Sequence, residues 1–600
     1  MNSEEWSKNA CQRIRQGSDF VQRHLDYMTD MVRIDSRSFN VNEFEGDRLT
    51  PTDMQEILAL AKDYLLDIGF QQVQINVPPP SPERSTPILM AEIEAGPDKP
   101  TLLMYAHLDK QPYMDDHRFE KWGGVPPTEL RWNEDGSRAY GRGAADDLSG
   151  VVAIGLAVDA VLQTLGFDAK KPAPGLLEQL PCNLKVIFET EEESGSHSLI
   201  PQILQNREFF ESTDCVIITD VTNPDTGVPG LTTSLRGILQ MHAHLRPIGG
   251  SPAIDDQTAL YKVLSTLIRE DHSLAVEDIT QEDLPVTKEE RQGYEKIPTT
   301  LQALRDQAGL LPETRLIVPA DKVSVIEAQL RTSYVNIRPG HRVAGGVVFG
   351  AAGTRLTLEA EGLNDRPGFI QWLKDRIEGM NRFRVKVQLR ELTSPGDSTL
   401  TLDLILQSAS KDPHSGIIGG PFPVPELLVA KMMDELVGWD GWFGISGWEP
   451  FFQTGKVSRK ISLQALHVEH DGSARIFDED SAHALIEIRL GPGQKIERAR
   501  EVLINYLMAH VPDGFGLYLA EDKGGDPWST QIDHPAFTQM LKSLEVGYGR
   551  EPCLYGCGGS IPFVAKLMGA LGDVPPLCLG AYDPDCRMHE PGESLSMADL

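Results

Sequence analysis

Residues 140–165 read YGRGAADDLSGVVAIGLAVDAVLQTL, a Gly-rich turn with two adjacent aspartates followed by a long apolar run. The run from Leu148 to Leu165 is apolar at most positions, so it predicts a helix that packs against a sheet. In α/β proteins, polar loops between strands and such helices carry the ligand-binding side chains. The stretch therefore predicts an α/β fold with Asp146 and Asp147 at the edge of a sheet.

The sequence around this stretch alternates strand and helix patterns over the first 234 residues. Short apolar runs predict buried strands, and apolar residues at helical spacing predict helices. We expect strands at 87–93, 101–106, 184–189 and 215–219, and further helices at 19–32 and 53–66. Strands that alternate with helices predict a mostly parallel sheet covered by helices.

The middle of the chain has a different pattern. From about residue 235 to 522, β-rich stretches alternate with amphipathic helices and Gly/Pro turns, and the α/β pattern then returns. We therefore expect an α/β catalytic domain made of residues 1–234 and 523–600, with an α+β region, 235–522, inserted between its two parts.

The inserted region contains two pairs of similar stretches. MHAHLRPIGGSPAIDD (241–256) resembles LILQSASKDPHSGIIGGPFPVPE (404–426), and SYVNIRPG (333–340) resembles ALIEIRLGPG (484–493). Both halves have a strand, an Ile-Gly-Gly turn and a helix, then a strand that ends in Ile-Arg. This order favours an internal duplication, with copies at about 235–392 and 399–522, over chance recurrence of a common pattern.

Composition excludes some partners. The formal net charge of −32 repels phosphate backbones, which argues against nucleic acid. The seven cysteines are odd in number and irregularly spaced, which favours a reducing compartment over a disulfide framework. The start, MNSEEWSKNACQRIRQ, has no apolar run, and no stretch approaches the ~20 apolar residues of a membrane span. We expect a cytoplasmic protein with neither a nucleic-acid nor a membrane partner.

Five separate turns place His, Asp or Glu where strands of one sheet would end. They contain His107 with Asp109, Asp146 with Asp147, Glu191 to Glu193, Asp220, and His589. Carboxylates that converge without basic partners repel one another, and divalent cations remove this repulsion. Two histidines with several carboxylates suit zinc, and also manganese or cobalt.

Each of these turns alone has a plainer interpretation. Adjacent aspartates usually cap a helix, three glutamates usually form a solvated turn, and a His-x-Asp pair is common in cores and on surfaces. Only the joint pattern, in order and at strand ends, indicates a metal site.

The chain resembles the co-catalytic zinc peptidases and amidohydrolases that include carnosinase, carboxypeptidase G, aminoacylase and succinyl-diaminopimelate desuccinylase. The resemblance covers about 1–240 and 404–600. The motifs that carry it are MYAHLDKQP (104–112), YGRGAADDLSG (140–150), FETEEESGS (188–196), IITD (217–220), TTSLRG (232–237), HSG with IGG (414–420), GGSIP (558–562) and the late His589.

The resemblance implies two metal ions, with zinc expected and manganese or cobalt as alternatives. Asp146 would bridge them, His107 and Asp220 would complete one site, and Glu193 and His589 the other. It also implies a cis peptide bond between Asp146 and its neighbour Asp147.

The resemblance also implies roles around the metals. Asp109 would orient His107, and Glu192 would act as general base. In the inserted region, which is the lid of this family, His414 would stabilise the oxyanion and Arg489 would bind the substrate carboxylate. Backbone N–H groups of the loop Gly558, Gly559 and Ser560 would bind the same carboxyl end.

Two departures from the family bear on assembly and substrate. In many members the lid histidine comes from a partner subunit, whereas a doubled lid imitates the dimer within one chain. We therefore expect a monomer with a pseudo-dimeric lid, with a homodimer as the alternative. Cys557 and Gly558 stand where carnosinase-type members have an acid that holds a free substrate amine, which argues against a simple unblocked dipeptide.

Three functions remain open at this point. The first is a metallopeptidase of the dipeptidase type that acts on small peptides, and the second is an N-acyl-amino-acid amidohydrolase with the same metals. The third is a peptide-binding protein without catalysis, which the complete set of ligand and base motifs disfavours. A serine hydrolase is disfavoured because the sequence has no Gly-x-Ser-x-Gly motif.

Overall fold

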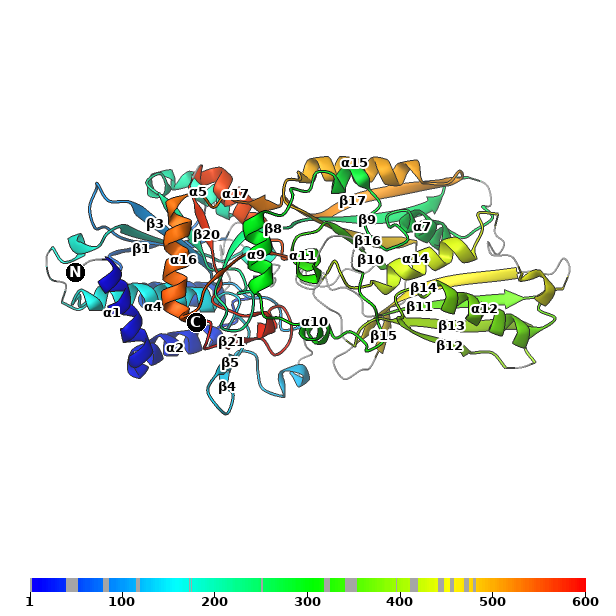
Figure 1. The fold of residues 1–600 in the computed structure, drawn as a ribbon, viewed down its shortest axis with the longest axis horizontal. Coiled ribbons are helices and arrows are strands. Elements are labelled where there is room, and N and C mark those ends of the chain that lie inside the picture. Colours follow the sequence, from blue (N-terminus) through cyan, green and yellow to red (C-terminus); the bar gives the residue numbers. More distant parts are fainter. Residues whose placement is uncertain are drawn as a thin grey trace.

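We describe a computed structural model of the 600-residue chain. The described residues are 3–38, 52–78, 86–114, 119–171, 173, 175–249, 252–317, 324–339, 353–394, 396–410, 419–440, 447–453, 458–468, 474–477, 482–572 and 574–600. Figure 1 shows an elongated molecule with two lobes, and both ends of the chain lie in the same lobe.

The first lobe, here the α/β lobe, is built on a nine-stranded sheet in the order β1-β2-β6-β3-β7-β20-β8-β18, with β19 also paired to β8. Its strands are β1 (Gln72–Asn76), β2 (Ile88–Ile93), β3 (Thr101–His107), β6 (Asn183–Glu189), β7 (Cys215–Ile218), β8 (Gly230–Leu235), β18 (Trp528–Ser529), β19 (Cys553–Cys557) and β20 (Pro576–Cys578). The central strands β6, β3, β7 and β20 run parallel, and antiparallel strands flank them. The expected α/β class with a parallel central sheet is confirmed.

Helices cover both faces of this sheet (Figure 1). They are α1 (Ser3–Gln16), α2 (Ser18–Arg33), α3 (Thr52–Ile68), α4 (Leu148–Thr164), α5 (Leu199–Gln205), α6 (Arg207–Phe210), α16 (Pro535–Tyr548) and α17 (Pro562–Leu571). Along β3, Met104 and Ala106 join the core formed with α2, α3 and α4, whereas Leu103 and Tyr105 join the core formed with α5 and α17. This alternation buries β3 on both faces, as its continuous apolar sequence predicts.

A small three-stranded sheet adjoins the α/β lobe. It consists of β4 (Arg131–Trp132), β5 (Arg138–Tyr140) and β21 (Ser594–Ser596), in the order β21-β5-β4. Pairing of β21 with β5 brings the last residues of the chain beside the Gly-rich turn that begins at Tyr140.

The second lobe, here called the lid lobe after the role that the resemblance implies, contains two antiparallel sheets. One has the order β10-β16-β9-β17 and the other the order β12-β13-β11-β14-β15. The elements are β9 (Gly237–Pro247), α7 (Asp256–Ser265), α8 (Glu277–Thr280), β10 (Tyr334–Pro339), β11 (Gly353–Glu361), α12 (Arg366–Met380), β12 (Lys386–Glu391), β13 (Thr399–Gln407), α14 (Pro425–Leu436), β14 (Ser458–Val468), β15 (Ala474–Phe477), β16 (His483–Leu490), α15 (Ile496–Ala509) and β17 (Phe515–Gly525).

The two lid sheets share a topology, and one lies inside the other in sequence. The first is made by β9, α7, β10, β16, α15 and β17, and the second, made by β11, α12, β12, β13, α14 and β14, is inserted between β10 and β16. In each, the four strands lie in the spatial order second, third, first, fourth. A single hydrophobic core contains residues from both sheets.

A segment between α8 and β10 returns to the α/β lobe. It contains α9 (Lys288–Lys296), α10 (Leu301–Gln307) and α11 (Val325–Leu330), and Figure 1 shows α9 beside β8. Tyr294 of α9 is buried in a cluster with Cys553 and Tyr555 of β19. The range 235–522 therefore includes a segment whose apolar side chains pack on the α/β lobe.

Two expectations from the sequence concern membrane-spanning helices and disulfide bonds. No helix among the described residues is both long and apolar enough to span a bilayer. All seven cysteines are described, and each carries a free thiol.

Candidate metal centre

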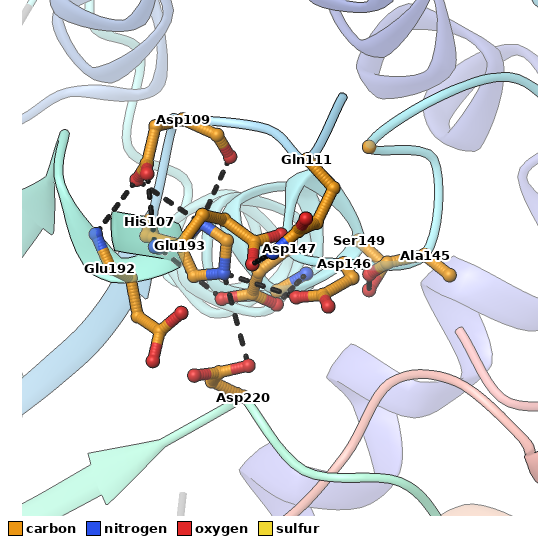
Figure 2. Close-up of polar contacts among 12 residues, drawn as sticks. His107, Asp109, Gln111, Ala145, Asp146, Asp147, Ser149, Glu192, Glu193 and Asp220 are labelled. Atoms are coloured by element: carbon orange, nitrogen blue, oxygen red, sulfur yellow. Dashed lines mark hydrogen bonds and ion pairs between the residues drawn. The ribbon is translucent and has the colours of Figure 1, made fainter. Parts of the chain in front are cut away.

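Side chains from five segments meet at the carboxyl ends of the parallel strands. Figure 2 shows His107, Asp146, Glu193 and Asp220 of this group. His107 is the last residue of β3, and Asp220 follows β7 by two residues. Glu193 lies in a short 3-10 helix, η4 (Glu192–Ser194), that follows β6. Asp146 directly precedes Asp147, the N-cap of α4, and His589 lies in the loop between β20 and β21. The convergence expected from the sequence is therefore present.

Asp146 stands at the middle of this group. Its Oδ1 lies 3.1 Å from Nε2 of His107, and its Oδ2 lies 2.9 Å from Nε2 of His589. Nε2 of His107 is also 3.8 Å from Oδ1 of Asp220, and Nε2 of His589 is 3.1 Å from Oε2 of Glu193. One carboxylate therefore faces two separate His–carboxylate pairs, which is the arrangement a bridging ligand needs.

Burial of these carboxylates is electrostatically costly. Burial raises the pKa of Asp220 well above its usual value, with repulsion from Glu192 as the next cause. Burial also raises the pKa of Glu193, and it raises the pKa of Glu192 to about 8, together with repulsion from Glu193 and Asp146. Burial opposes the ionisation of Asp146, but the hydrogen bonds from the two histidines hold its pKa well below the usual range.

This donor set fits divalent cations. His107, Asp146 and Glu193 have ligand atoms within 4.8 Å of one another, and so do His107, Glu192 and Asp220. Oε1 of Glu193 is buried without a hydrogen-bond partner. Nitrogen and carboxylate donors suit zinc, manganese or cobalt, and the positive charge would stabilise the ionised carboxylates.

The two adjacent aspartates have different environments. The peptide bond between Asp146 and Asp147 is cis, as the family resemblance implied. Oδ1 of Asp147 accepts a hydrogen bond from the backbone N–H of Gly150 and so caps α4, while its Oδ2 accepts one from the N–H of His107. The capping interpretation therefore holds for Asp147, whereas Asp146 faces the histidines.

Asp109 connects the His107 turn with the glutamate turn. Its carbonyl oxygen lies 3.0 Å from Nδ1 of His107, and its Oδ1 lies 3.4 Å from the same nitrogen. The backbone N–H groups of Glu192 and Glu193 each donate to its carboxylate at 3.1 Å (Figure 2). Asp109 is fully buried, so it fixes both the ring of His107 and the position of the two glutamates.

Glu191, the first glutamate of the turn that contains Glu192 and Glu193, has a structural role. Its Oε2 accepts hydrogen bonds from Thr86 and from the hydroxyl and N–H of Ser198, all of which are buried. It therefore stabilises the turn below the site and does not face the cavity.

A cavity of about 120 Å³ opens beside the centre. Its lining contains Gln111, Asp146, Glu192, Glu193, Gly195, Asp220, Val221, Thr222, Ile238, Arg489, Lys523, Cys557, Gly559, Ser560, Ile561, Pro562, Tyr582, Met588 and His589. The lining thus combines the candidate metal ligands, an apolar wall, and two cations from the lid lobe.

The expected carboxylate-binding residues meet at one end of this cavity. Arg489 of β16 donates through Nη1 to Oγ of Ser560 at 2.8 Å, and its Nε donates to Oε1 of Glu487 at 3.1 Å. Gly559 also lines the cavity, whereas the carbonyl of Gly558 accepts a hydrogen bond from Arg236. His414 lies outside the described residues.

Sequence reasoning did not single out four residues that the structure places at or behind the centre. Gln111 donates to Oε2 of Glu193 at 2.5 Å, and the hydroxyl of Tyr582 donates to Oδ1 of Asp220 at 3.2 Å. Glu593 binds the loop that carries Asp146, and Lys523 lines the cavity. Gln111 lies within the motif that contains His107, and Glu593 follows His589 by four residues. Closeness in sequence to a candidate metal ligand was therefore the only signal that could have indicated them.

Comparison with known proteins supports the resemblance. Residues 103–600 match the model of peptidase family M20/M25/M40. The Beta-Ala-His dipeptidase of Mus musculus is 29% identical over 269 residues, which cover 41% of this chain and 49% of that protein. The Cys-Gly metallodipeptidase DUG1 of Candida albicans is 27% identical over 317 residues, which cover 50% of this chain and 60% of that protein. The chain thus spans about half the length of the curated relatives that it matches.

Solved structures show the same fold over nearly the whole chain. The dipeptidase Dug1p from Saccharomyces cerevisiae aligns with a TM-score of 0.59 at 17% identity and covers 100% of this chain and 95% of that one. Human carnosine dipeptidase 1 aligns with a TM-score of 0.58 at 18% identity and covers 99% and 95%. With the family model matched from residue 103 to residue 600, the chain belongs to the peptidase family M20/M25/M40.

Proposed function

We propose that this protein is a metal-dependent dipeptidase whose centre holds two divalent ions bridged by Asp146. The observation that carries the proposal is the position of Asp146, whose two oxygens lie 3.1 and 2.9 Å from the histidines of two His–carboxylate pairs. The names of the two curated relatives, a Beta-Ala-His dipeptidase and a Cys-Gly metallodipeptidase, favour a dipeptide as substrate. Zinc is the expected metal, with manganese or cobalt as alternatives.

We assign His107 and Asp220 to one ion, and Glu193 and His589 to the other. Bound there, the ions would polarise the scissile carbonyl and lower the pKa of a water molecule. Glu192 lines the cavity next to these ligands, and its raised pKa suits a group that accepts a proton from water and donates it to the leaving nitrogen.

The far end of the cavity suits a substrate carboxylate. The guanidinium of Arg489 is planar and can bind a carboxylate through two hydrogen bonds, and Ser560 and Gly559 add donors beside it. His414 remains the predicted oxyanion donor on the evidence of its motif alone.

A second candidate is an N-acyl-amino-acid amidohydrolase. Among the described residues that line the cavity, the acids are Asp146, Glu192, Glu193 and Asp220, all at the metal centre. Cys557 and Gly558 stand where carnosinase-type members have an acid that would hold a free ammonium group, and Cys557 lines the cavity. A blocked amine would need no such partner.

The test compares free and N-acetylated dipeptides with the protein loaded with zinc, manganese or cobalt. We expect hydrolysis of free dipeptides, and we expect Glu192→Gln to keep its metal but lose about 10²–10⁴-fold in kcat. Glu208→Gln, at an exposed position of α6, is the matched control and should keep full activity. Hydrolysis of N-acetylated substrates alone would favour the second candidate, and full activity in Glu192→Gln would overturn both.

The cellular compartment and the partners of the protein also remain predictions. We propose a cytoplasmic enzyme without nucleic-acid or membrane partners, in keeping with the net charge of −32.

A further inference from the structure

Lys523 of the lid lobe reaches the cavity because of a single-residue bulge. Strand β17 pairs antiparallel with β9, with Glu521 opposite Met241 and Lys523 opposite Gln240. Asp522 is the extra residue at this point, so the alternation of side chains along β17 changes register here.

The bulge decides which charge enters the cavity. Residues opposite each other in an antiparallel pair share a face of the sheet. Met241 belongs to the lid core, and Glu521 opposite it forms an ion pair with Arg500 of α15. The other face carries Lys523. Without the bulge, an aspartate would face Gln240 and the lysine would lie opposite Leu239, in the hydrophobic core.

The charge of Arg489, the other cation in the cavity lining, is already balanced by a carboxylate. Nε of Arg489 lies 3.1 Å from Oε1 of Glu487, and Oε2 of Glu487 accepts a hydrogen bond from Gln240 at 2.8 Å. Among the described parts of the chain, no carboxylate lies within ion-pair distance of Lys523. It is partly buried, and burial lowers its pKa while Glu192 opposes this effect. An anion beside Lys523 would therefore restore the solvation that burial removes.

We infer that Lys523 binds a second anionic group of the substrate, so that the preferred substrates carry an acidic side chain on the residue whose α-carboxylate is bound by Arg489 and Ser560. The inference rests on the proposed function. It assigns two carboxylates to the leaving residue, which makes aspartate or glutamate the favoured C-terminal residue of a dipeptide. The two cations then have separate partners: Arg489, which contacts Ser560, takes the α-carboxylate, and Lys523 takes the side-chain carboxylate.

The test measures kcat/KM for alanyl-glutamate against alanyl-glutamine, and for alanyl-aspartate against alanyl-asparagine. A charge-assisted contact predicts a preference of about tenfold to a hundredfold for the acidic member of each pair, mainly through KM. Lys523→Met should abolish the preference by lowering kcat/KM far more for the acidic substrates than for the amide substrates, and Lys523→Glu should shift the preference to alanyl-lysine. Lys542→Met, an exposed substitution on α16, is the matched control and should retain the wild-type preference.

Metal content and melting temperature of each variant show whether it folds. An equal loss for acidic and amide substrates in Lys523→Met would assign the lysine to the α-carboxylate and overturn the inference. Hydrolysis by the wild type without an acidic preference would also overturn it but leave the proposed function intact. If no dipeptide is cleaved, the proposed function fails, and calorimetric binding of N-acetyl-glutamate against N-acetyl-glutamine decides the inference, with equal affinities contradicting it.

Discussion

Glu593 connects the two loops that carry Asp146 and His589. It follows His589 by four residues and is 1% exposed. Its two oxygens accept hydrogen bonds of 2.7–3.1 Å from four groups: the backbone N–H groups of Gly143, Ala145 and Asp146, and the guanidinium of Arg142. A single carboxylate therefore sets the position of Asp146 relative to His589, a histidine more than 400 residues later in sequence.

We predict that Glu593→Gln weakens metal binding. The amide would keep the size of the side chain but would turn an N–H group towards donors that now meet an acceptor, so the loop before α4 would shift. Partners of metal ligands typically contribute about 10–100-fold to affinity, and we expect a loss in this range. Metal titration of the purified variant gives the measurement.

Glu545→Gln, exposed on α16, controls for the loss of one negative charge and should bind metal as the wild type does. Wild-type affinity in Glu593→Gln would show that the loop holds its shape without the carboxylate.

At the scale of elements, α9 supports the loop that we propose binds the substrate carboxylate. Strand β19 leads directly into Gly558, Gly559 and Ser560, and α9 packs against this strand. The hydroxyl of Tyr294 accepts a hydrogen bond from the N–H of Gly556 at 3.0 Å. The helix approaches so closely because Gly293 has no side chain: a Cβ there would lie 1.6 Å from the carbonyl oxygen of Leu554.

Gly293→Ala should therefore destabilise the protein and impair substrate binding. The backbone of β19 cannot rotate away as a side chain could, so the helix must move, at a cost of about 1–3 kcal/mol. We expect a lower melting temperature and a raised KM. Gly379→Ala in α12 is the control, because the added Cβ would meet no atom within 4 Å apart from the backbone of its own helix, and alanine favours helix. A melting temperature of Gly293→Ala at or above that of the wild type would contradict this supporting role of α9.

The elements that sequence predicts well are those that local pattern determines. The apolar run after Asp147 forms α4, and the strands expected at 101–106, 184–189 and 215–219 form β3, β6 and β7. Because residues at the ends of parallel strands converge, these elements sufficed to bring His107, Asp146, Glu193 and Asp220 together.

Features that depend on distant pairing were not predictable in this way. Lys523 enters the cavity through a one-residue bulge in β17, and nothing local in its sequence distinguishes it from a lysine on a regular strand. The return of α9 to β19 likewise depends on the fit of Gly293 against Leu554. Such contacts follow from tertiary packing, which a single sequence does not display.

At the scale of the whole molecule, the two lid sheets form one body. Lys262 of α7 is 3% exposed, and its ammonium donates to Oδ1 of Asp434 at 2.7 Å and to the carbonyl of Val437 at 2.7 Å, at the C-terminal end of α14. Cations at helix C-termini stabilise the helix, and here the cation comes from the other sheet. We propose that the sheets are two copies of one unit, the second (about 353–468) inserted into the first (237–339 and 483–525), in place of the consecutive copies expected from the motifs.

This arrangement predicts a monomer. In a dimeric relative of the kind described above, the second lid unit would come from the partner, whereas here α7 and α14 already bury their apolar faces in a common core within one chain. Light scattering after gel filtration should give a mass near 66.3 kDa that does not change with concentration. Mixing Glu192→Gln with His414→Ala provides a second measurement, because lid residues exchanged between subunits would restore about one active site in four. We expect no recovery, since each chain would use its own lid; a doubled mass together with recovered activity would show that the chain needs a partner to complete its site.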